Sequence, residues 1–514
     1  MIIFENEFFL VANKPVGIAS HTVDNNKFGF IEYLESRINY KLYICHRLDK
    51  ETSGVIVFAK DKETCRLISE EFAKRNVVKK YLFISENRLK ENEIIHKSFI
   101  EKKSNKFVSI KNLKPNSETK IKFLNEYGKY RIYEAIPKTG KPHQIRLHCK
   151  DLGIPILGDA EHQGPIFSRL MLHSNKINFT FKNQIYSFEC PPSKLFSKEY
   201  LLSNNNLANY INAIDRRKIL FDLNSANNNT YRVIHTEGKY LRCDKLGDKL
   251  WFYWYKEDLP NKDELNKILS ICKELEINEY KIQLMLNRGA SPDNLDNLSN
   301  IIVGDWIATE NSIKYVFKKN QGFSSGLFLD QRQNRKWVLE NSSEQSVLNL
   351  FCYTGGFSLV AALGKAKEVV SVDTSKKTLE WAKENFKINN LDPNNYEFWS
   401  SDARHYVKGS IKRGRKFDLI ICDPPSFARN KDCVFKIEKD FNNLIFDLIK
   451  ILNPKGKILF STNYEKWTRE DLIFQIKDLK LSNIVVASSP PLDLDYELPY
   501  QDQLMKSVIL EKLS

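Results

Sequence analysis

The sequence predicts an α+β domain over residues 1–192, a linker over 193–230, a small α+β domain over 231–318 and a doubly wound α/β domain over 319–514. Three observations predict this organisation. A chain of 514 residues is too long for one hydrophobic core, because domains usually contain about 100–200 residues. The stretch after Pro191-Pro192 is rich in Asn, Ser and Lys around a short helix-like stretch, which is typical of a linker. From Val347 onward, strands alternate with helices, which is typical of a doubly wound sheet.

The composition indicates a folded protein with an affinity for polyanions. Apolar residues make up 42% of the chain, which is ordinary for a globular protein and outside the disordered class. The formal net charge is +15. A positive surface potential of this kind attracts polyanions, so it favours nucleic acid over neutral metabolites as a partner.

The cysteines and the hydropathy pattern bear on the cellular compartment. The nine cysteines are scattered singly with no Cys-x-x-Cys pair, so the sequence predicts neither a zinc site nor a disulfide framework. Glu5 and Glu7 interrupt the apolar N-terminal stretch, and no apolar run reaches the roughly eighteen residues that a membrane span needs. We therefore expect a cytoplasmic protein without an export signal, a membrane span or a metal.

Periodicity predicts the first elements of residues 1–192. Residues 2–12 alternate between apolar and polar side chains as a strand does, and Lys14-Pro15-Val16-Gly17 predicts a turn. The further elements expected are helices over 28–38 and 63–75 and strands around Tyr81 and over 130–137.

The stretch of greatest chemical interest in this region is His46–Gly54, HRLDKETSG. It places His, Arg, Asp, Thr, Ser and Gly between two apolar runs, Leu42–Cys45 and Val55–Ala59. A carboxylate flanked by cationic and hydroxyl groups at a strand–loop–strand junction is how a reactive acid is presented, so Asp49 is a candidate nucleophile. For an isolated Asp beside an Arg, a loop-capping role is the competing interpretation.

HRLDKETSG closely resembles the signature of the RluA-type pseudouridine synthases, RNA enzymes whose catalytic aspartate stands at the position of Asp49. Other stretches that match in the same order are NKPVG (13–17), KKYLF (79–83), KPHQIRLH (141–148), MLHSNKINF (171–179) and ECPP (189–192). The resemblance therefore covers about residues 1–192.

This resemblance implies roles for individual residues. Tyr81 would lie against the target base, and Arg146 would pair with Asp49 and keep its carboxylate ionised and oriented. No cofactor is implied. The residues expected to contact RNA are Lys14, His46, Arg47, Lys141 and His143.

The sequence departs from the family at one loop. The family usually has Gly-Arg-Thr-His-Gln, whereas this chain has Gly140-Lys141-Pro142-His143-Gln144. The replacement keeps a positive charge but loses the bidentate contact that an arginine makes with phosphate. The family resemblance therefore supports the predicted catalytic residues more firmly than the predicted RNA contacts.

The central region predicts a strand-strand-helix-strand-strand unit without chemistry. Two aromatic-rich strands between Tyr231 and Tyr255 are divided by a turn at Gly247-Asp248. A helix over 262–275 and strands near 281–286 and 312–318 complete it. Its aromatic side chains are expected to form a core.

In the last region, acidic residues follow successive strands. The stretch 347–362 predicts a buried strand, a loop with Gly355-Gly356 and a helix, which is the first turn of a nucleotide-binding sheet. Later strands end at Asp373, at Asp402 and at Asp423-Pro424-Pro425. Because ligands bind outside the carboxyl ends of such strands, we expect these carboxylates to line one crevice.

These segments resemble class I S-adenosylmethionine (SAM) methyltransferases, from about Tyr231 to the end of the chain. The string FLDQRQNR, Phe328–Arg335, is similar to one found in enzymes that methylate guanine N7 or cytosine C5 of large-subunit ribosomal RNA. The last strand, 503–510, matches the antiparallel final strand of that fold. In the resembled enzymes the Asp-Pro-Pro-aromatic string holds a flipped base, which implies Asp423, Pro424, Pro425 and Phe427. The residues expected to bind SAM are Gln331, Arg332, Phe351, Tyr353, Thr354, Gly355, Gly356, Asp373, Thr374, Ser375, Asp402, Ala403 and Asp423.

One position bears on the methylated base. Cytosine C5 methylation needs a cysteine nucleophile, which the resembled cytosine enzymes carry in an FSCS string. Here the string is Phe460-Ser461-Thr462-Asn463, with Thr462 in place of that cysteine, and Cys422 is expected to be a core residue. Guanine N7 is therefore the favoured methyl acceptor, because its lone pair attacks the methyl group without a covalent step. Guanine N2 is the second candidate.

Together these observations predict a bifunctional RNA-modifying enzyme that forms pseudouridine and methylates 23S ribosomal RNA with SAM. Two alternatives stay open. One half could have lost its chemistry and serve as an RNA-binding module, and the pseudouridine half could act on transfer RNA. The nucleotides modified and the oligomeric state are not predicted by the sequence.

Overall fold

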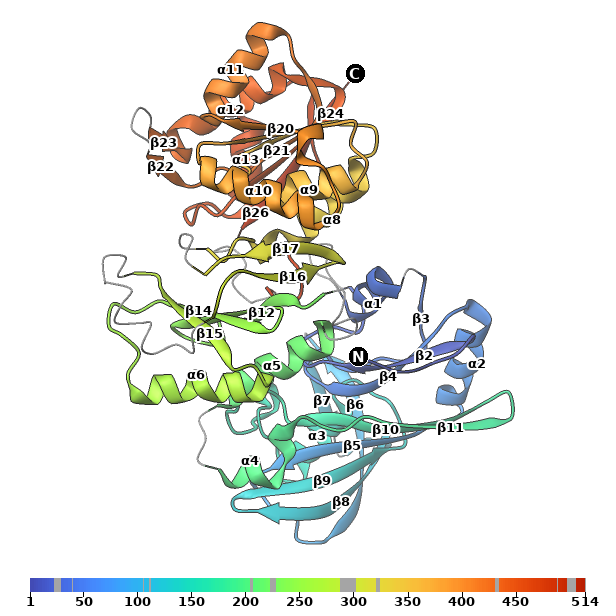
Figure 1. Cartoon of the computed structure of the whole chain (residues 1–514). Helices are drawn as coiled ribbons and strands as arrows, with labels where there is room; N and C mark the ends of the chain where they lie inside the picture. Colours follow the sequence, from blue (N-terminus) through green and yellow to red (C-terminus); the bar gives the residue numbers. More distant parts are fainter. Residues whose placement is uncertain are drawn as a thin grey trace. The chain divides into compact units, whose positions relative to one another are not determined.

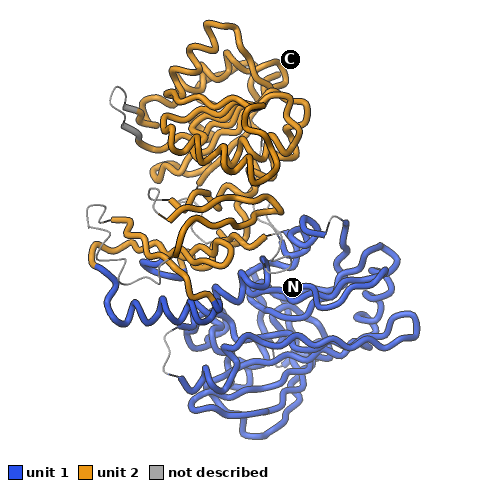
Figure 2. Tube along the Cα trace, viewed as in Figure 1, with its two compact units in different colours: residues 1–225, 237–241, 259–276 blue, residues 226–236, 242–258, 277–514 orange. Residues whose placement is uncertain are grey.

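The computed structural model of the chain contains two compact units (Figure 1 and Figure 2). Unit 1 consists of residues 1–225, 237–241 and 259–276, and unit 2 of residues 226–236, 242–258 and 277–514. The residues that the structure describes are 1–22, 29–38, 40–104, 106–110, 112–203, 207–221, 228–286, 302–319, 324–429, 434–487, 489–496 and 505–513. Among the described helices, none combines the length and apolarity that crossing a membrane requires.

Unit 1 has an α+β fold built on one mixed sheet (Figure 1). Within the described residues its strand order is β1-β2-β4-β10-β5-β9-β8-β6-β7, with β3 beside β4 and β11 beside β10. The strands are β1 (Ile2–Glu5), β2 (Phe9–Lys14), β3 (Tyr43–Ile44), β4 (Ser53–Ala59), β5 (Val78–Ser85), β6 (Glu93–Lys103), β7 (Lys106–Ile110), β8 (Ser117–Tyr127), β9 (Tyr130–Pro137), β10 (Leu172–Phe181) and β11 (Gln184–Glu189).

Most of the local expectations for unit 1 are confirmed. The strand expected over 130–137 is β9, and the helices expected over 28–38 and 63–75 are α1 and α2, although Phe28 lies outside the described residues. The strand expected over 2–12 is divided into β1 and β2, because Asn6 accepts backbone hydrogen bonds and closes a turn. The helices are α1 (Phe30–Ile38), α2 (Lys62–Ala73), α3 (Gln144–Asp151), η1 (Ala160–His162), η2 (Lys194–Phe196), α4 (Lys198–Leu202), α5 (Ala208–Phe221) and α6 (Lys262–Leu275).

The segment expected as a linker, 193–230, is more ordered than its composition indicated. Its described residues include η2, α4 and α5. Ile211, Ile214 and Leu220 of α5 are buried, and their helical spacing gives this helix an apolar face. The sequence indicated one short helix-like stretch in this segment, whereas most of its described part is helical.

The small α+β domain expected over 231–318 is not a compact unit of its own. Helix α6 belongs to unit 1, while its strands lie almost wholly in unit 2. Within unit 2, Trp251 and Trp306 share one hydrophobic core with Val347 and Phe357 of the neighbouring α/β sheet. The strands are β12 (Thr230–Ile234), β13 (Leu241–Leu246), β14 (Lys249–Trp254), β15 (Glu279–Leu284), β16 (Trp306–Glu310) and β17 (Ile313–Phe317), so three strands stand where two were expected, and β16 was not anticipated.

The α/β part of unit 2 confirms the doubly wound prediction. Seven described strands form a sheet in the order β20-β19-β18-β21-β24-β26-β25, in which only β26 runs antiparallel to its neighbours. The strands are β18 (Ser346–Leu350), β19 (Glu368–Asp373), β20 (Glu397–Ser400), β21 (Phe417–Cys422), β24 (Leu452–Thr462), β25 (Ile484–Ala487) and β26 (Lys506–Lys512), with a separate hairpin of β22 (Phe427–Arg429) and β23 (Val434–Lys436).

Helices cover both faces of this sheet (Figure 1). Successive residues of one strand enter different cores: Val347 joins Leu359 of α9, whereas Leu348 joins Leu444 of α12. Burial on both faces explains why these strands are continuous apolar runs. The helices are η4 (Leu329–Gln331), α8 (Arg332–Asn341), α9 (Gly356–Leu363), α10 (Lys376–Ile388), η5 (Pro393–Asn395), α11 (Ala403–Arg413), α12 (Ile437–Lys450) and α13 (Arg469–Asp478).

Candidate active sites

The first cavity, in unit 1, surrounds Asp49. This residue lies in the loop between β3 and β4 and is half-buried. The cavity has a volume of about 1120 Å³, and Thr52, Tyr81 and Arg146 line it together with Asp49. Residues of the HRLDKETSG, KKYLF and KPHQIRLH motifs therefore meet at one cavity. The space is ample for a nucleotide that has left its stack.

Lys14 supports the Asp49 loop and does not face solvent. Its side chain is fully buried, and its Nζ donates hydrogen bonds to the carbonyl oxygens of Pro15, Ile18 and Lys50 at 3.0, 2.7 and 3.1 Å. Burial lowers the pKa of Lys14 to about 7. The expected RNA contact is wrong for this residue, because a side chain without exposed surface does not reach a phosphate.

Further residues that no motif singled out hold the same loop. The hydroxyl of Ser20 donates to the carbonyl oxygen of Leu48 at 2.8 Å and accepts from its N–H at 3.1 Å. On the other side of Asp49, the buried Arg169 donates to Ser53 Oγ at 2.6 Å. Arg169 and Ser53 are 116 positions apart, so no local spacing could have indicated this contact.

Arg146 does not form the expected ion pair with Asp49 in this structure. Its Nε and Nη2 donate to the two carboxylate oxygens of Asp159 at 2.8 and 2.6 Å, and Nη2 also donates to Glu161 at 3.0 Å. Asp159 is only 1% exposed, and a buried carboxylate requires such a bidentate partner. Arg146 still interacts electrostatically with Asp49 across the cavity that both line. The prediction of a direct pair is therefore wrong.

Tyr81 lines the cavity that contains Asp49, and its expected contact with the target base stays a prediction. Tyr81 belongs to β5 and is 9% exposed. Burial raises the pKa of Tyr81 to about 12; the charge of Asp49 adds to the increase and a hydrogen bond with Ser174 opposes it. The phenol is therefore neutral at physiological pH, and its ring is available to a base.

The other residues expected to contact RNA differ in exposure. His46 stacks on Phe72 with ring centroids 4.6 Å apart, and burial lowers the pKa of His46 to about 3, so it carries no charge for a phosphate. Arg47 and Lys141 are exposed and line the cavity, so both remain predicted RNA contacts. His143 also lines the cavity, and its Nδ1 lies 3.1 Å from a second imidazole nitrogen.

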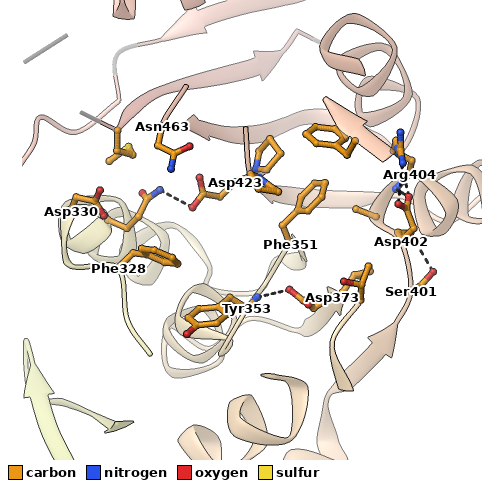
Figure 3. Close-up of a pocket in the computed structure, with 18 residues that line it drawn as sticks. Phe328, Asp330, Phe351, Tyr353, Asp373, Ser401, Asp402, Arg404, Asp423 and Asn463 are labelled. Carbon is orange, nitrogen blue, oxygen red and sulfur yellow. Dashed lines mark hydrogen bonds and ion pairs between the residues drawn. The ribbon is translucent and has the colours of Figure 1, made fainter. Parts of the chain in front are cut away.

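The second cavity, in unit 2, lies at the carboxyl ends of β18, β19, β20, β21 and β24 (Figure 3). Its volume is about 340 Å³, within the range of small-molecule sites. The prediction that Asp373, Asp402 and Asp423 would line one crevice is confirmed. The other predicted residues that line it are Gln331, Phe351, Tyr353, Thr374, Ala403, Pro424 and Pro425.

The loop after β18 has a strained backbone. Phe351, Tyr353 and Gly355 have φ angles of 56°, 49° and 73°, all in the left-handed region. A Cβ on Gly355 would lie 2.7 Å from the Cβ of Ala382, so space as well as φ requires glycine there. Strain of this kind is concentrated at ligand sites, where the surrounding structure holds it in place.

Two carboxylates on one side of the cavity are oriented by backbone N–H groups. Asp373 accepts from the N–H of Tyr353 through Oδ2 and from that of Ser375 through Oδ1, both at 2.9 Å (Figure 3). Asp402 precedes α11 and accepts from the N–H of Arg404 at 2.9 Å. Burial raises the pKa of Asp402, but the hydrogen bond and charge of the Arg404 side chain outweigh it and lower the pKa overall. Asp402 is therefore ionised at neutral pH.

Asp423 has a different electrostatic environment. Figure 3 shows it near Asp330 and Asn463, away from Asp402. Burial raises the pKa of Asp423 to about 7, the charge of Asp330 adds to this increase, and a hydrogen bond of 2.9 Å from Gln331 Nε2 opposes it. Two carboxylates at one end of a cavity favour a cationic ligand.

Some predicted residues shape the site without lining it. Arg332 is fully buried, and its Nη1 donates to Asp493 and Asp495, each at 3.0 Å, so its predicted contact with SAM is wrong. Thr354 Oγ1 donates to the carbonyl oxygen of Gly326, and Phe427 is 56% exposed in β22. The predicted residues outside the cavity lining are Arg332, Thr354, Gly355, Gly356, Ser375 and Phe427.

Sequence reasoning also missed residues that line the cavity. Phe328 and Asp330 belong to the quoted string FLDQRQNR, and Asn463 to the string after the fifth strand, so both strings contained the signal. Phe435 and Met505 carry no motif and reach the cavity only through the fold.

No cysteine of the described chain is placed to act as a nucleophile in the second cavity. Thr462 is fully buried at the end of β24, and its Oγ1 accepts from the N–H of Tyr464 at 3.1 Å. Cys422 is also buried, and burial raises its pKa well above the usual range. Asn463 lines the cavity and accepts a hydrogen bond from Ser426 at 2.9 Å.

Comparisons with known proteins agree with these two sites. Residues 8–151 match the family model of RNA pseudouridylate synthase, and residues 260–476 match that of S-adenosylmethionine-dependent methyltransferase. "Ribosomal RNA large subunit methyltransferase K/L" of Shewanella pealeana is 38% identical over 193 residues, which is 37% of this chain and 26% of that protein. "Ribosomal RNA large subunit methyltransferase K" of Neisseria meningitidis is 36% identical over 185 residues, which is 35% of this chain and 52% of that protein.

The chain thus spans between about a quarter and a half of the length of these two relatives. A solved structure described as "a putative methyltransferase complexed with SAH" is 27% identical, with a TM-score of 0.52, and covers 60% of this chain and 82% of its own. The chain therefore combines a domain of the RNA pseudouridylate synthase family, over residues 8–151, with a domain of the S-adenosylmethionine-dependent methyltransferase family, over residues 260–476.

Proposed function

We propose that this chain is a bifunctional RNA-modifying enzyme. The first domain converts a uridine to pseudouridine, and the second methylates a base of 23S ribosomal RNA with SAM. One observation carries this proposal. Asp49 and Asp423 each lie in a cavity that is also lined by other residues of the motifs by which the chain resembles the respective family. A net charge of +15 suits an RNA substrate.

In the first cavity, Asp49 is the nucleophile. Its carboxylate bonds to ribose C1′ as the bond from C1′ to uracil N1 breaks. The turned uracil then bonds to C1′ through C5 and releases the carboxylate, and the C5 proton is lost while N1 is protonated, without a cofactor. Tyr81 packs against the base, and Arg146 places a positive charge in the cavity that it lines together with Asp49. Because Asp159 engages Arg146 directly, the oxygen atoms of Asp49 stay available for the attack.

In the second cavity, the residues present suit SAM. The carboxylate of Asp373, fixed by two backbone N–H groups, is placed to accept hydrogen bonds from ribose hydroxyls. Asp402 would hold the adenine end of SAM, and Phe351 and Tyr353, which also line the cavity, would supply apolar walls. SAM supplies an electrophilic methyl group on a cationic sulfonium. Asp423 and Asp330 place negative charge at the end of the cavity assigned to the methyl-accepting base.

Guanine N7 is the methyl acceptor that this arrangement favours. Cytosine C5 would require a thiol where Thr462 stands. Methylation of N7 gives the purine a positive charge, which Asp423 stabilises as it develops when its carboxylate is ionised. Guanine N2 is the second candidate, because an exocyclic amine loses a proton and Asp423, with a pKa near 7, is suited to accept it.

The names of the relatives support large-subunit ribosomal RNA as the substrate of the second domain. For the first domain, transfer RNA is the competing substrate. Both reactions are assigned to the cytoplasm, where these RNAs are available.

Asp49→Asn and Asp423→Asn variants of the full chain test the proposal. Each is expressed in cells that lack the wild-type protein, and modified nucleosides of ribosomal and transfer RNA are mapped by mass spectrometry. We expect Asp49→Asn to abolish one set of pseudouridines and leave the methyl mark, and Asp423→Asn to do the reverse. The chromatographic identity of the lost methylated nucleoside separates guanine N7, guanine N2 and cytosine C5.

Two outcomes would contradict the proposal. If one substitution changes no nucleoside while the other does, the silent half is an RNA-binding module. If the lost pseudouridines lie only in transfer RNA, the two domains act on different molecules.

A further inference from the structure

Three metal-ligating side chains meet at the rim of the Asp49 cavity. Nδ1 of His143 lies 3.1 Å from Nε2 of His162 and 3.5 Å from Oε1 of Glu161. The ligand atoms of all three lie within 4.8 Å of one another, and the described part of the chain holds no second group of three such side chains. His143 also lines the cavity that contains Asp49.

The separations suit a tetrahedral zinc ion. Bonds of about 2.0–2.1 Å from zinc to nitrogen or oxygen, at tetrahedral angles, place neighbouring ligand atoms about 3.3 Å apart. The two contacts of 3.1 and 3.5 Å lie on either side of this value. Two histidines and a carboxylate are also a ligand set that zinc uses when one coordination position stays open.

The surrounding structure orients each ligand. His143 is held in a left-handed conformation, with φ of 55°, at the start of α3, and its ring packs beside Phe107. His162 is 4% exposed within η1, so the packing around it fixes the position of its ring. Arg146 holds Oε2 of Glu161 at 3.0 Å while Oε1 points toward His143. Such outer contacts fix ligands at metal sites.

We propose that His143, Glu161 and His162 form a site for a divalent transition metal of the zinc class, with one coordination position left for water or a substrate oxygen. The ion would fasten the loop that carries Lys141 to the turn around η1, and so fix the rim over which RNA enters. The absence of Cys-x-x-Cys pairs argues only against thiolate sites and leaves this nitrogen and oxygen set open.

Zinc binding to the full chain tests the site directly. Protein treated with a chelator and then desalted is titrated with Zn²⁺ in competition with a chromophoric zinc indicator. The wild type is expected to hold one more equivalent than His162→Gln, and Glu161→Gln is expected to bind that equivalent at least about tenfold more weakly. His96→Gln is the matched control, because His96 also contacts a carboxylate, Asp151, but lies outside the proposed site.

A second measurement covers the case in which His162→Gln, which alters a buried residue, does not fold. Glu161 is 38% exposed, so Glu161→Gln is expected to fold, and Co²⁺ absorption and the zinc-dependent rise in unfolding temperature are compared with the wild type. Equal stoichiometry, affinity and Co²⁺ spectra in the wild type, Glu161→Gln and His96→Gln would mean adventitious binding and would overturn the proposal.

Discussion

The charge of Asp423 depends on what occupies the second cavity. Its pKa of about 7 reflects burial and the neighbouring Asp330, and a cationic sulfonium placed nearby would favour the ionised form. SAM is therefore expected to bind more tightly as the pH rises through 7, by up to about tenfold between pH 6 and 8, with release of a proton. Calorimetry in buffers of different ionisation enthalpy measures both quantities.

Asp423→Asn is the control for this pH dependence. The amide keeps a hydrogen-bonding group beside Gln331 but does not titrate, so its SAM affinity should be the same across this range. A wild-type affinity that does not change with pH would place the titrating group elsewhere.

Lys14 is expected to support catalysis from a buried position. Lys14→Met leaves three carbonyl oxygens without their donor, which should lower the free energy of unfolding by about 3 kcal/mol and displace the Asp49 loop. We expect loss of most pseudouridine formation with unchanged SAM binding. Thermal unfolding, a pseudouridine assay and SAM titration of the full chain measure these effects.

Lys62→Met, at an exposed position of α2, is the matched substitution and should leave both activities intact. If Lys14→Met retains normal pseudouridine formation, the Asp49 loop does not depend on this ammonium group.

At the scale of elements, the loop after β18 offers a comparison between two glycines. Gly355 and Gly414 have similar φ angles, 73° and 69°, but an added Cβ meets Ala382 at 2.7 Å in the first case and nothing within 4 Å in the second. Gly414→Ala should lower the free energy of unfolding only through backbone strain, by about 1 kcal/mol. Gly355→Ala carries the steric clash as well, and should cost more stability and weaken SAM binding.

Unfolding temperatures and SAM dissociation constants of the two variants check this expectation. Equal losses in both would show that the close approach to Ala382 has no effect on the loop.

Local periodicity predicted the helices and strands whose bounds depend on their own sequence. The helix over 262–275 and the strand over 130–137 have the expected bounds, because the spacing of their own apolar residues determines them. The shared crevice of Asp373, Asp402 and Asp423 was predictable for a related reason, since the carboxyl ends of parallel strands meet at one edge.

The carboxylate partners of the buried arginines were not predictable in this way. Arg332 was assigned to SAM from its motif, but its partner Asp495 is 163 positions away. Arg146 was assigned to Asp49 through family resemblance, whereas Asp159, only 13 positions away, takes the guanidinium. In both cases a buried arginine pairs with the carboxylate that the fold buries beside it.

At the scale of the whole molecule, the net charge of +15 leads to a prediction about salt. Binding of a 23S ribosomal RNA transcript should weaken by at least about tenfold between 50 and 200 mM salt, because cationic side chains displace counterions from the RNA. SAM affinity should change little over the same range. Filter binding and calorimetry compare the two, and a salt-independent RNA affinity would show that the excess charge does not face the RNA.

The course of the chain between residues 225 and 277 limits how the protein can be divided. Residues 237–241 and 259–276 belong to unit 1, although the segments on either side of them belong to unit 2 (Figure 2). A single protease cleavage or gene truncation therefore either removes α6 from the fragment that contains unit 1 or leaves segments of unit 2 attached to that fragment. No one break point yields two intact halves, so separating the two reactions requires point substitutions rather than truncation.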